Sequence, residues 1–188
     1  LGRPLLVFEA LRVGYRWASA RIHRFVLDGM ADNRARCAAA GVRYYGYVEP
    51  SPGEGQGLLG ALAERACEVV TDEFPCFFLP RMVAAAAKAL PVRLTAVDSN
   101  GVLPLRASEH REFTVAHSFR RHFQKMAHPH LEAFPEPEPL EGAQALGQAS
   151  VPAEISRRWP ELQPDLDLAA LPIDQAVGPA PGVTGGAV

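Results

Sequence analysis

The sequence predicts an α/β fold: an open, mostly parallel, Rossmann-like sheet with helices on both faces, followed by a proline-rich connector. Three observations predict it. Short apolar segments alternate with helical patterns along residues 5–98, and such alternation produces parallel sheets. The apolar segments are nearly continuous, as in strands buried on both faces. Each of them also ends in an acidic residue.

The first unit of this alternation is a strand and a long helix. The apolar run "LLVFE", residues 5–9, predicts a strand that ends at Glu9. A helix is predicted from about Ala18 to Ala40, with Gly41 as its C-terminal stop. Its apolar face is expected to contain Ile22, Phe25, Val26, Met30 and Cys37.

The same alternation continues to residue 98. The aromatic segment "VRYYGYVEP", residues 42–50, predicts a strand that ends at Glu49, and "LLGALAERA" predicts a short helix after it. The segment "CEVV" predicts a third strand, which ends at Asp72, and "FFLPRMVAAAAKAL" a third helix. The segment "VRLTAV" predicts a fourth strand, which ends at Asp98.

Four acids therefore stand at predicted strand ends. In an open parallel sheet the ligand crevice lies outside the carboxyl ends of the strands. Glu9, Glu49, Asp72 and Asp98 are thus expected to surround one opening. For Asp72 and Asp98 a second interpretation stays open, because a carboxylate also caps a helix or binds loop amides.

Other motifs are weaker. The loop "PGEGQGLLGAL", residues 52–62, is read either as an anion cradle at a helix start or as a flexible surface loop. The segment "HREFTVAHSFRRHFQKMAHPH" is read as a solvated basic helix, or as a surface that meets another domain or a nucleic acid. Neither the histidines nor the three cysteines have the spacing of a metal site, and no catalytic residue can be assigned.

Composition divides the chain near Pro135. Residues 1–135 hold 17 of the 19 basic and 13 of the 21 acidic residues, so residues 136–188 are acidic. Nine of the 17 prolines lie between Pro135 and Pro181, a density that favours an extended connector. We therefore predict an α/β domain over residues 1–135 and a mobile linker over 136–188, in which Ile155, Trp159 and Leu162 are the candidates for one docked turn.

The sequence also leads to expectations about where the protein is located and about whether the chain is a whole protein. No apolar run reaches the roughly 18 residues that span a bilayer, and no signal-peptide pattern begins the chain, so no membrane partner and a cytoplasmic location are expected. The chain begins at Leu1, and we expect it to be a piece of a longer protein, truncated at its N-terminus.

Several ordered segments resemble one family. "RPLLVFEALRVGYRWASARIHRFVLDGMADN", "VVTDEFPCFFLPRMV", "LPVRLTAVDSNGVLPLRA" and "FTVAHSFRRHFQK" occur in this order. Together they resemble the N-terminal α/β domain of DNA photolyases, closest to the class II type. The resemblance covers about residues 3 to 140, and "AALPIDQAV" is similar to the linker that leads to the second domain of that family.

The resemblance implies a light-driven repair enzyme that acts on UV-damaged DNA. Such enzymes split cyclobutane pyrimidine dimers by electron transfer from reduced FAD. It implies that FAD and the catalytic residues belong to a helical C-terminal domain outside this chain, which is the partner of the present domain. It further implies an antenna chromophore, such as a deazaflavin, for the α/β domain itself.

Class II members commonly show an Asp-Ala-His-Asn cluster where this chain has Asp98, Ser99, Asn100 and Gly101. With Asn100 added, the candidate cofactor-binding residues are Glu9, Glu49, Asp72, Asp98 and Asn100. A different class stays open, because a cryptochrome-like photoreceptor or a nucleotide-binding signalling module uses the same sheet without repair.

Overall fold

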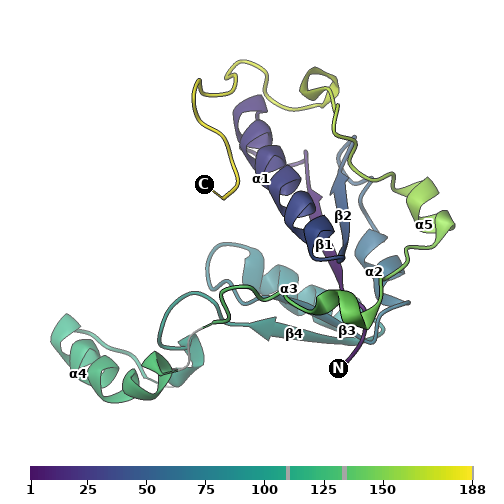
Figure 1. The fold of residues 1–188 in the computed structure, drawn as a ribbon. Coiled ribbons are helices and arrows are strands. Elements are labelled where there is room, and N and C mark those ends of the chain that lie inside the picture. Colours follow the sequence, from purple (N-terminus) through teal and green to yellow (C-terminus); the bar gives the residue numbers. More distant parts are fainter. Residues whose placement is uncertain (109–110, 133–134, 188) are drawn as a thin grey trace. The chain divides into compact units, whose positions relative to one another are not determined.

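The computed structural model describes residues 1–108, 111–132 and 135–187 (Figure 1). The chain forms two compact units. Unit 1 combines Leu1–Leu59 with Leu140–Val188, and unit 2 is the continuous segment Gly60–Pro139.

Unit 1 is built around a parallel pair of strands with a helical crossover. Strand β1 (Leu6–Leu11) pairs in parallel with β2 (Arg43–Val48), and α1 (Ala20–Ala39) connects them. The hydroxyl of Ser19 caps the helix by accepting a hydrogen bond from the amide of Ile22 at 3.4 Å. Gly41 follows the helix with a φ of 68°, a conformation that glycine adopts without strain.

The buried face of α1 differs from the predicted one. Ile22 and Phe25 are 40% and 50% exposed, so this part of the prediction is wrong. The helix is rotated because the fully buried ring of His23 occupies the inner face, and its two nitrogens lie 3.1 Å from the Ser19 carbonyl oxygen and 3.2 Å from the Arg12 carbonyl oxygen. A pattern that counts apolar residues alone misses a buried histidine with two backbone partners. The buried residues of α1 are Ala20, His23, Leu27, Met30 and Cys37.

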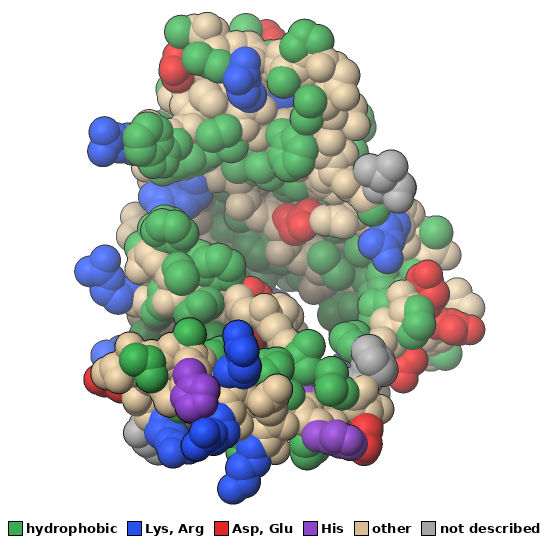
Figure 2. Space-filling model, turned by 90° about the vertical axis from the view of Figure 1, so that its left-hand side faces the viewer, with side chains coloured by type: hydrophobic (Ala, Val, Ile, Leu, Met, Phe, Trp, Pro, Cys, Tyr) green, Lys and Arg blue, Asp and Glu red, His purple; other side chains and the backbone are tan. Residues whose placement is uncertain are grey.

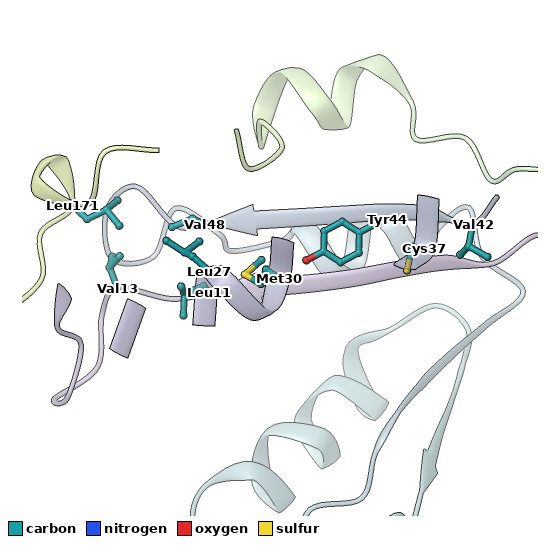
Figure 3. Close-up of a cluster of buried hydrophobic side chains, with 9 residues drawn as sticks. All are labelled: Leu11, Val13, Leu27, Met30, Cys37, Val42, Tyr44, Val48 and Leu171. Atoms are coloured by element: carbon teal, nitrogen blue, oxygen red, sulfur yellow. The ribbon is translucent and has the colours of Figure 1, made fainter. Parts of the chain in front are cut away.

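The main core of unit 1 lies where α1 covers β1 and β2. Figure 3 shows side chains from the helix, from both strands and from the C-terminal segment meeting in one cluster. Burial of these side chains from water is the principal stabilising contribution to unit 1. The cluster consists of Leu11, Val13, Leu27, Met30, Cys37, Val42, Tyr44, Val48 and Leu171.

Residues 140–188, for which the sequence predicts a mobile linker, are part of unit 1. Ile155, Trp159 and Leu171 are 5%, 4% and 7% exposed, so the segment contributes large side chains to the interior. The docked turn is confirmed: α5 (Ala153–Arg158) carries Ile155 and ends beside Trp159. A few widely spaced apolar residues are enough to hold the segment, although its average composition resembles that of a connector.

The backbone of this segment also pairs with unit 1. The amide of Leu162 donates to the carbonyl oxygen of Gly46 in β2 at 2.8 Å. Farther along, Asp174 forms a parallel bridge with Ser19, the N-cap of α1. The segment therefore covers the outer edge of β2 and the start of α1.

Unit 2 repeats the strand, helix, strand order. Strands β3 (Glu68–Asp72) and β4 (Arg93–Val97) are parallel and are joined by α3 (Leu79–Ala89). The short helix α2 (Leu58–Ala63) contains the point in the sequence, between Leu59 and Gly60, at which the chain passes from unit 1 to unit 2. Helix α4 (Ala116–Met126) follows β4. Single 3₁₀ turns lie at Leu105–Ser108 and His128–Leu131 in unit 2, and at Ala143–Leu146 and Leu168–Ala170 in unit 1.

The α/β class is confirmed, since both strand pairs are parallel and the elements are compatible with a Rossmann-like fold. The predicted end of the first strand is wrong by two residues, because β1 continues past Glu9 to Leu11. Within the described residues, no helix combines the length and the apolar character that crossing a membrane requires.

Candidate functional site

The carboxyl ends of β3 and β4 form the candidate site in unit 2. The in-register pair of Asp72 with Val97 places Asp98, the next residue, at the same edge of the sheet as Asp72. This is the arrangement that the sequence analysis expects for these two acids. Parallel pairing fixes it, because both chains leave their strands in the same direction.

Both acids bind neighbouring loop groups. The hydroxyl of Ser99 donates to a carboxylate oxygen of Asp72, which ties the ends of β3 and β4 together. Asp98 accepts from the amide of Leu105 through one oxygen. Its other oxygen accepts from the amide and the side-chain nitrogen of Asn100, at 3.1 and 3.0 Å.

The pKa of Asp98 lies below its ordinary value. The amide of Leu105 contributes most, followed by the side chain and the amide of Asn100, because all three donate to the ionised carboxylate. Asn100 also donates from its side chain to the carbonyl oxygen of Glu73 at 2.5 Å. Asp98 and Asn100 thus fix the loop after β4 against the end of β3.

A hollow with a volume of about 780 Å³ lies beside this cluster, between α3 and β4. The guanidinium of Arg106 donates to Glu73 at 2.7 Å, and this pair forms part of the wall of the hollow. Volumes between about 300 and 1,000 Å³ with apolar walls and few polar groups are typical of small-molecule sites. The lining residues are Glu73, Phe74, Pro75, Pro80, Val83, Ala84, Ala87, Arg93, Leu94, Thr95, Ala96, Leu105 and Arg106.

In unit 1, Glu49 follows β2 and is only 3% exposed. One carboxylate oxygen accepts from the amide of Val13 at 3.1 Å. The other accepts from the amides of Gly53 and Gly55 at 2.8 and 3.3 Å. Burial raises the pKa of Glu49, but these three hydrogen bonds outweigh it, so its pKa lies below the ordinary value.

The glycine-rich loop therefore already holds an anion, which is the side chain of Glu49. Gly53 and Gly57 have φ values of 92° and 90°, which let the loop turn its amides inward. An external phosphate would have to displace a buried carboxylate to use the amides of Gly53 and Gly55. Glu49 is accordingly placed to position the loops after β1 and β2.

Glu9 lies inside β1, on the face that α1 covers. The side chain of Asn33 in α1 donates to one carboxylate oxygen at 2.8 Å, and the hydroxyl of Tyr44 in β2 donates to the other at 2.5 Å. Burial, followed by the hydrogen bond to Glu9, raises the pKa of Tyr44 far above its ordinary value. Glu9 therefore joins the helix to both strands rather than lining a strand end.

The structure thus brings three of the five candidate residues together, namely Asp72, Asp98 and Asn100. Glu9 and Glu49 lie in unit 1, and the single opening expected for all four acids stays a prediction. The sequence analysis missed Arg106 as a partner of the cluster. The one indication of Arg106 in the sequence is the opposite charge of Glu73, its partner, which directly follows a strand end.

A second hollow, about 300 Å³ in volume, lies in unit 1 against the C-terminal segment. Its polar wall is internally paired, because Arg43 forms an ion pair with Glu161 and Arg34 donates to the carbonyl oxygen of Leu162. These contacts hold the segment on β2. We assign them a structural role.

Ser108 and His122 form the contact that most resembles a catalytic pair, with the serine hydroxyl 3.0 Å from Nε2. The guanidinium of Arg111 lies 3.2 Å from Nδ1 of the same ring. A guanidinium only donates, so Nδ1 accepts and the ring proton lies on Nε2, facing the serine. His122 in this tautomer does not accept a proton from Ser108.

Among the residues that the structure describes, no three His, Cys, Asp or Glu side chains are grouped so that they could hold a metal ion. Cys37 is buried, and Cys67 and Cys76 are exposed and unpaired with one another. The candidate site consists of carboxylates, one amide, one guanidinium and an apolar hollow.

No protein-family model matches the chain. Over 137 residues, 73% of its length, the chain is 28% identical to a deoxyribodipyrimidine photo-lyase from Methanothermobacter thermautotrophicus. The matched part is 29% of the length of that photolyase, so the chain corresponds to less than a third of the relative. The similarity supports a relationship between this chain and the photolyase family.

Proposed function

We propose that this chain is the antenna-type α/β domain of a photolyase-type enzyme, closest to class II, that repairs cyclobutane pyrimidine dimers in DNA. The observation that carries the proposal is the similarity to a photolyase over 137 residues, which extends across both units of the chain. The catalytic residues and the FAD site would lie in a further domain of the intact protein.

The hollow between α3 and β4 is the proposed chromophore site. Its walls suit a planar aromatic molecule, because apolar residues of α3 and of β4 line it. Phe74 adds an aromatic ring to the lining, and the pair of Glu73 and Arg106 adds polar groups. A chromophore held there would supply light absorption, and FAD in the further domain would supply the electron for repair.

The acids of the candidate site act through the loops in this proposal. Asp98 and Asn100 fix the loop after β4, and Ser99 joins it to Asp72. Leu105 and Arg106, which line the hollow, follow directly on that loop. We assign Asp72, Asp98 and Asn100 the role of shaping the hollow for its ligand.

A pair of cavity variants tests the chromophore site. Ala84 in α3 lines the hollow, whereas Ala85, its neighbour on the same helix, does not. Titration of the protein with a synthetic deazaflavin, followed by fluorescence, should show saturable binding that Ala84→Trp abolishes and Ala85→Trp preserves. Binding that survives Ala84→Trp would place the chromophore elsewhere.

Repair is tested on the intact protein. Light should restore a thymine-dimer oligonucleotide in its presence, whereas residues 1–188 alone should neither bind FAD nor repair. If the intact protein absorbs light but does not repair the dimer, a cryptochrome-like photoreceptor is favoured. Stoichiometric micromolar binding of FAD by residues 1–188 would contradict the assignment of FAD to another domain.

A further inference from the structure

The helix α4 carries an uninterrupted basic surface that the functions above do not use. Within α4 there are three basic residues, Arg120, Arg121 and Lys125, and no acid. All three are exposed, as are His117 and, in the next turn, His128. Figure 2 shows Lys, Arg and His side chains gathered on the lower part of the face that α4 occupies.

The spacing places these groups on one side of the helix. Residues 117, 121 and 125 are four apart, so they follow one another along a stripe. At a rise of 1.5 Å per residue, the stripe from His117 to Lys125 is about 12 Å long. Arg120 lies beside it, so the surface could meet several neighbouring phosphate groups.

The three charges also have no acidic partner among the residues that the structure describes. Elsewhere in the described residues, Arg24, Arg43 and Arg106 pair with Asp28, Glu161 and Glu73, respectively. By contrast, no acid among the described residues pairs with Arg120, Arg121 or Lys125, and the guanidinium of Arg121 lies 3.3 Å from Nε2 of His117. A cluster of unpaired cations attracts a polyanion and releases its counterions on contact.

The opposite side of α4 is partly covered by aromatic rings of the same segment, and Phe119 there is still 45% exposed. The ring of Phe113 packs edge-on against Phe119, with ring centroids 5.4 Å apart, and at a tilt against His122, with centroids 4.9 Å apart. Phe119 in turn packs against Phe123. His122 is further held by Ser108. The basic stripe lies on the side away from these rings, where Arg120, Arg121 and Lys125 are exposed.

We propose that the basic stripe of α4, Arg120, Arg121 and Lys125, binds the phosphate backbone of a nucleic acid. The exposed charges commit the proposal to phosphate groups, and because Phe119 on the other side of α4 is 45% exposed, a lipid surface is the competing occupant that the experiment below separates. The inference goes beyond the antenna role and does not depend on it, because neither a lesion nor a chromophore is involved.

A charge-neutralising variant with a matched control tests the proposal. Arg121→Gln/Lys125→Gln removes two charges from α4, and Arg81→Gln/Lys88→Gln removes two exposed charges from α3 in the same unit. The affinity of the intact protein for an undamaged DNA duplex is measured by fluorescence anisotropy over a range of NaCl concentrations. Circular dichroism checks that each variant keeps its helical content.

We expect the α4 variant to bind the duplex at least tenfold more weakly at low salt, with the control variant little changed. The slope of log affinity against log salt should become shallower by nearly two, since each phosphate contact contributes about 0.9. The charge-preserving Arg121→Lys should keep the wild-type slope. Equal losses in the α3 and α4 variants, or none in either, would overturn the proposal.

Vesicles of phosphatidylserine and phosphatidylcholine provide the competing arm. If the proposal is right, the wild type and the α4 variant should sediment with these vesicles to the same extent. If the α4 variant loses vesicle binding but keeps duplex binding, the surface is a lipid site and the nucleic-acid proposal fails. Because the duplex is undamaged, either result leaves the repair proposal to its own test.

Discussion

The carboxylate of Glu49 and the amide of Val13, separated by 36 positions in the sequence, are joined by a buried hydrogen bond of 3.1 Å. Val13 belongs to the loop after β1, and Glu49 begins the loop after β2. With its bonds to Gly53 and Gly55, one side chain fixes both loops at the carboxyl end of this strand pair. The arrangement of that end of unit 1 depends on a single ionised group.

Replacement of Glu49 by glutamine should destabilise the protein. The side chain of glutamine keeps one acceptor oxygen, but its NH₂ group would point at backbone N–H groups. Some of these buried N–H groups therefore lose their acceptor. We expect the free energy of unfolding, measured in urea, to fall by about 2 kcal/mol or more. Glu54→Gln is the control, since Glu54 is exposed in the same loop and should change the stability little.

Stability should depend on pH through the same group. The pKa of Glu49 is lowered in the folded protein, so its contribution is fully present above the unfolded pKa of about 4.3 and is lost as the pH falls through the lower, folded pKa. Urea titrations from pH 7 downward should show the difference between wild type and Glu49→Gln shrinking below pH of about 4. A difference that stays constant down to the acid limit would show that ionisation of Glu49 is not the cause.

Trp159→Ala should release the C-terminal segment. The indole is 4% exposed and donates to the carbonyl oxygen of Glu54 at 2.9 Å, while the Tyr45 hydroxyl donates to the carbonyl oxygen of Trp159. We expect a loss of about 3 kcal/mol in unfolding free energy and rapid proteolysis within residues 140–188. Trp17→Ala, at a site that is 64% exposed, should leave the cleavage pattern unchanged.

The two acids at the ends of β3 and β4 should differ in effect. Asp98→Ala removes the acceptor for the amides of Asn100 and Leu105, so hydrogen exchange of both amides should become faster. Asp72→Ala removes only the bond from Ser99 and should lower the unfolding free energy by less than about 1 kcal/mol. Unchanged exchange at Leu105 in Asp98→Ala would contradict the role of Asp98 in fixing the loop.

The strand order could be predicted from the sequence because it depends on local patterns. Apolar runs that end in an acid predicted β2, β3 and β4 to within a residue or two at each end, and the parallel pairing brought Asp72 beside Asp98 as expected. Glu9 was different. Glu9 lies inside β1, where Asn33 and Tyr44 donate hydrogen bonds to its carboxylate. Both partners are distant in the sequence, so the local pattern around Glu9 does not predict them.

Beyond the docked turn of Ile155 and Trp159, the docking of residues 140–187 could not be predicted, for a related reason. Proline and acid content describe the average of a segment, whereas docking depends on where Ile155, Trp159 and Leu171 meet the rest of unit 1. Long-range contacts of this kind also explain the buried position of His23, which is satisfied by two backbone carbonyls. Both features require the tertiary structure to be known.

The composition of unit 1 from two distant segments has a consequence for synthesis on the ribosome. Residues 1–59 emerge early, but Trp159, Leu171 and Asp174 emerge only after unit 2 has been made. At roughly 5–20 residues per second, this delay is on the order of ten seconds. During that interval the outer edge of β2 has unpaired backbone groups and lacks its apolar cover, so the nascent chain is open to strand addition by a neighbour. Unit 2, being continuous, has no such interval, and the exposure of β2 ends when residues 140–187 have emerged and docked.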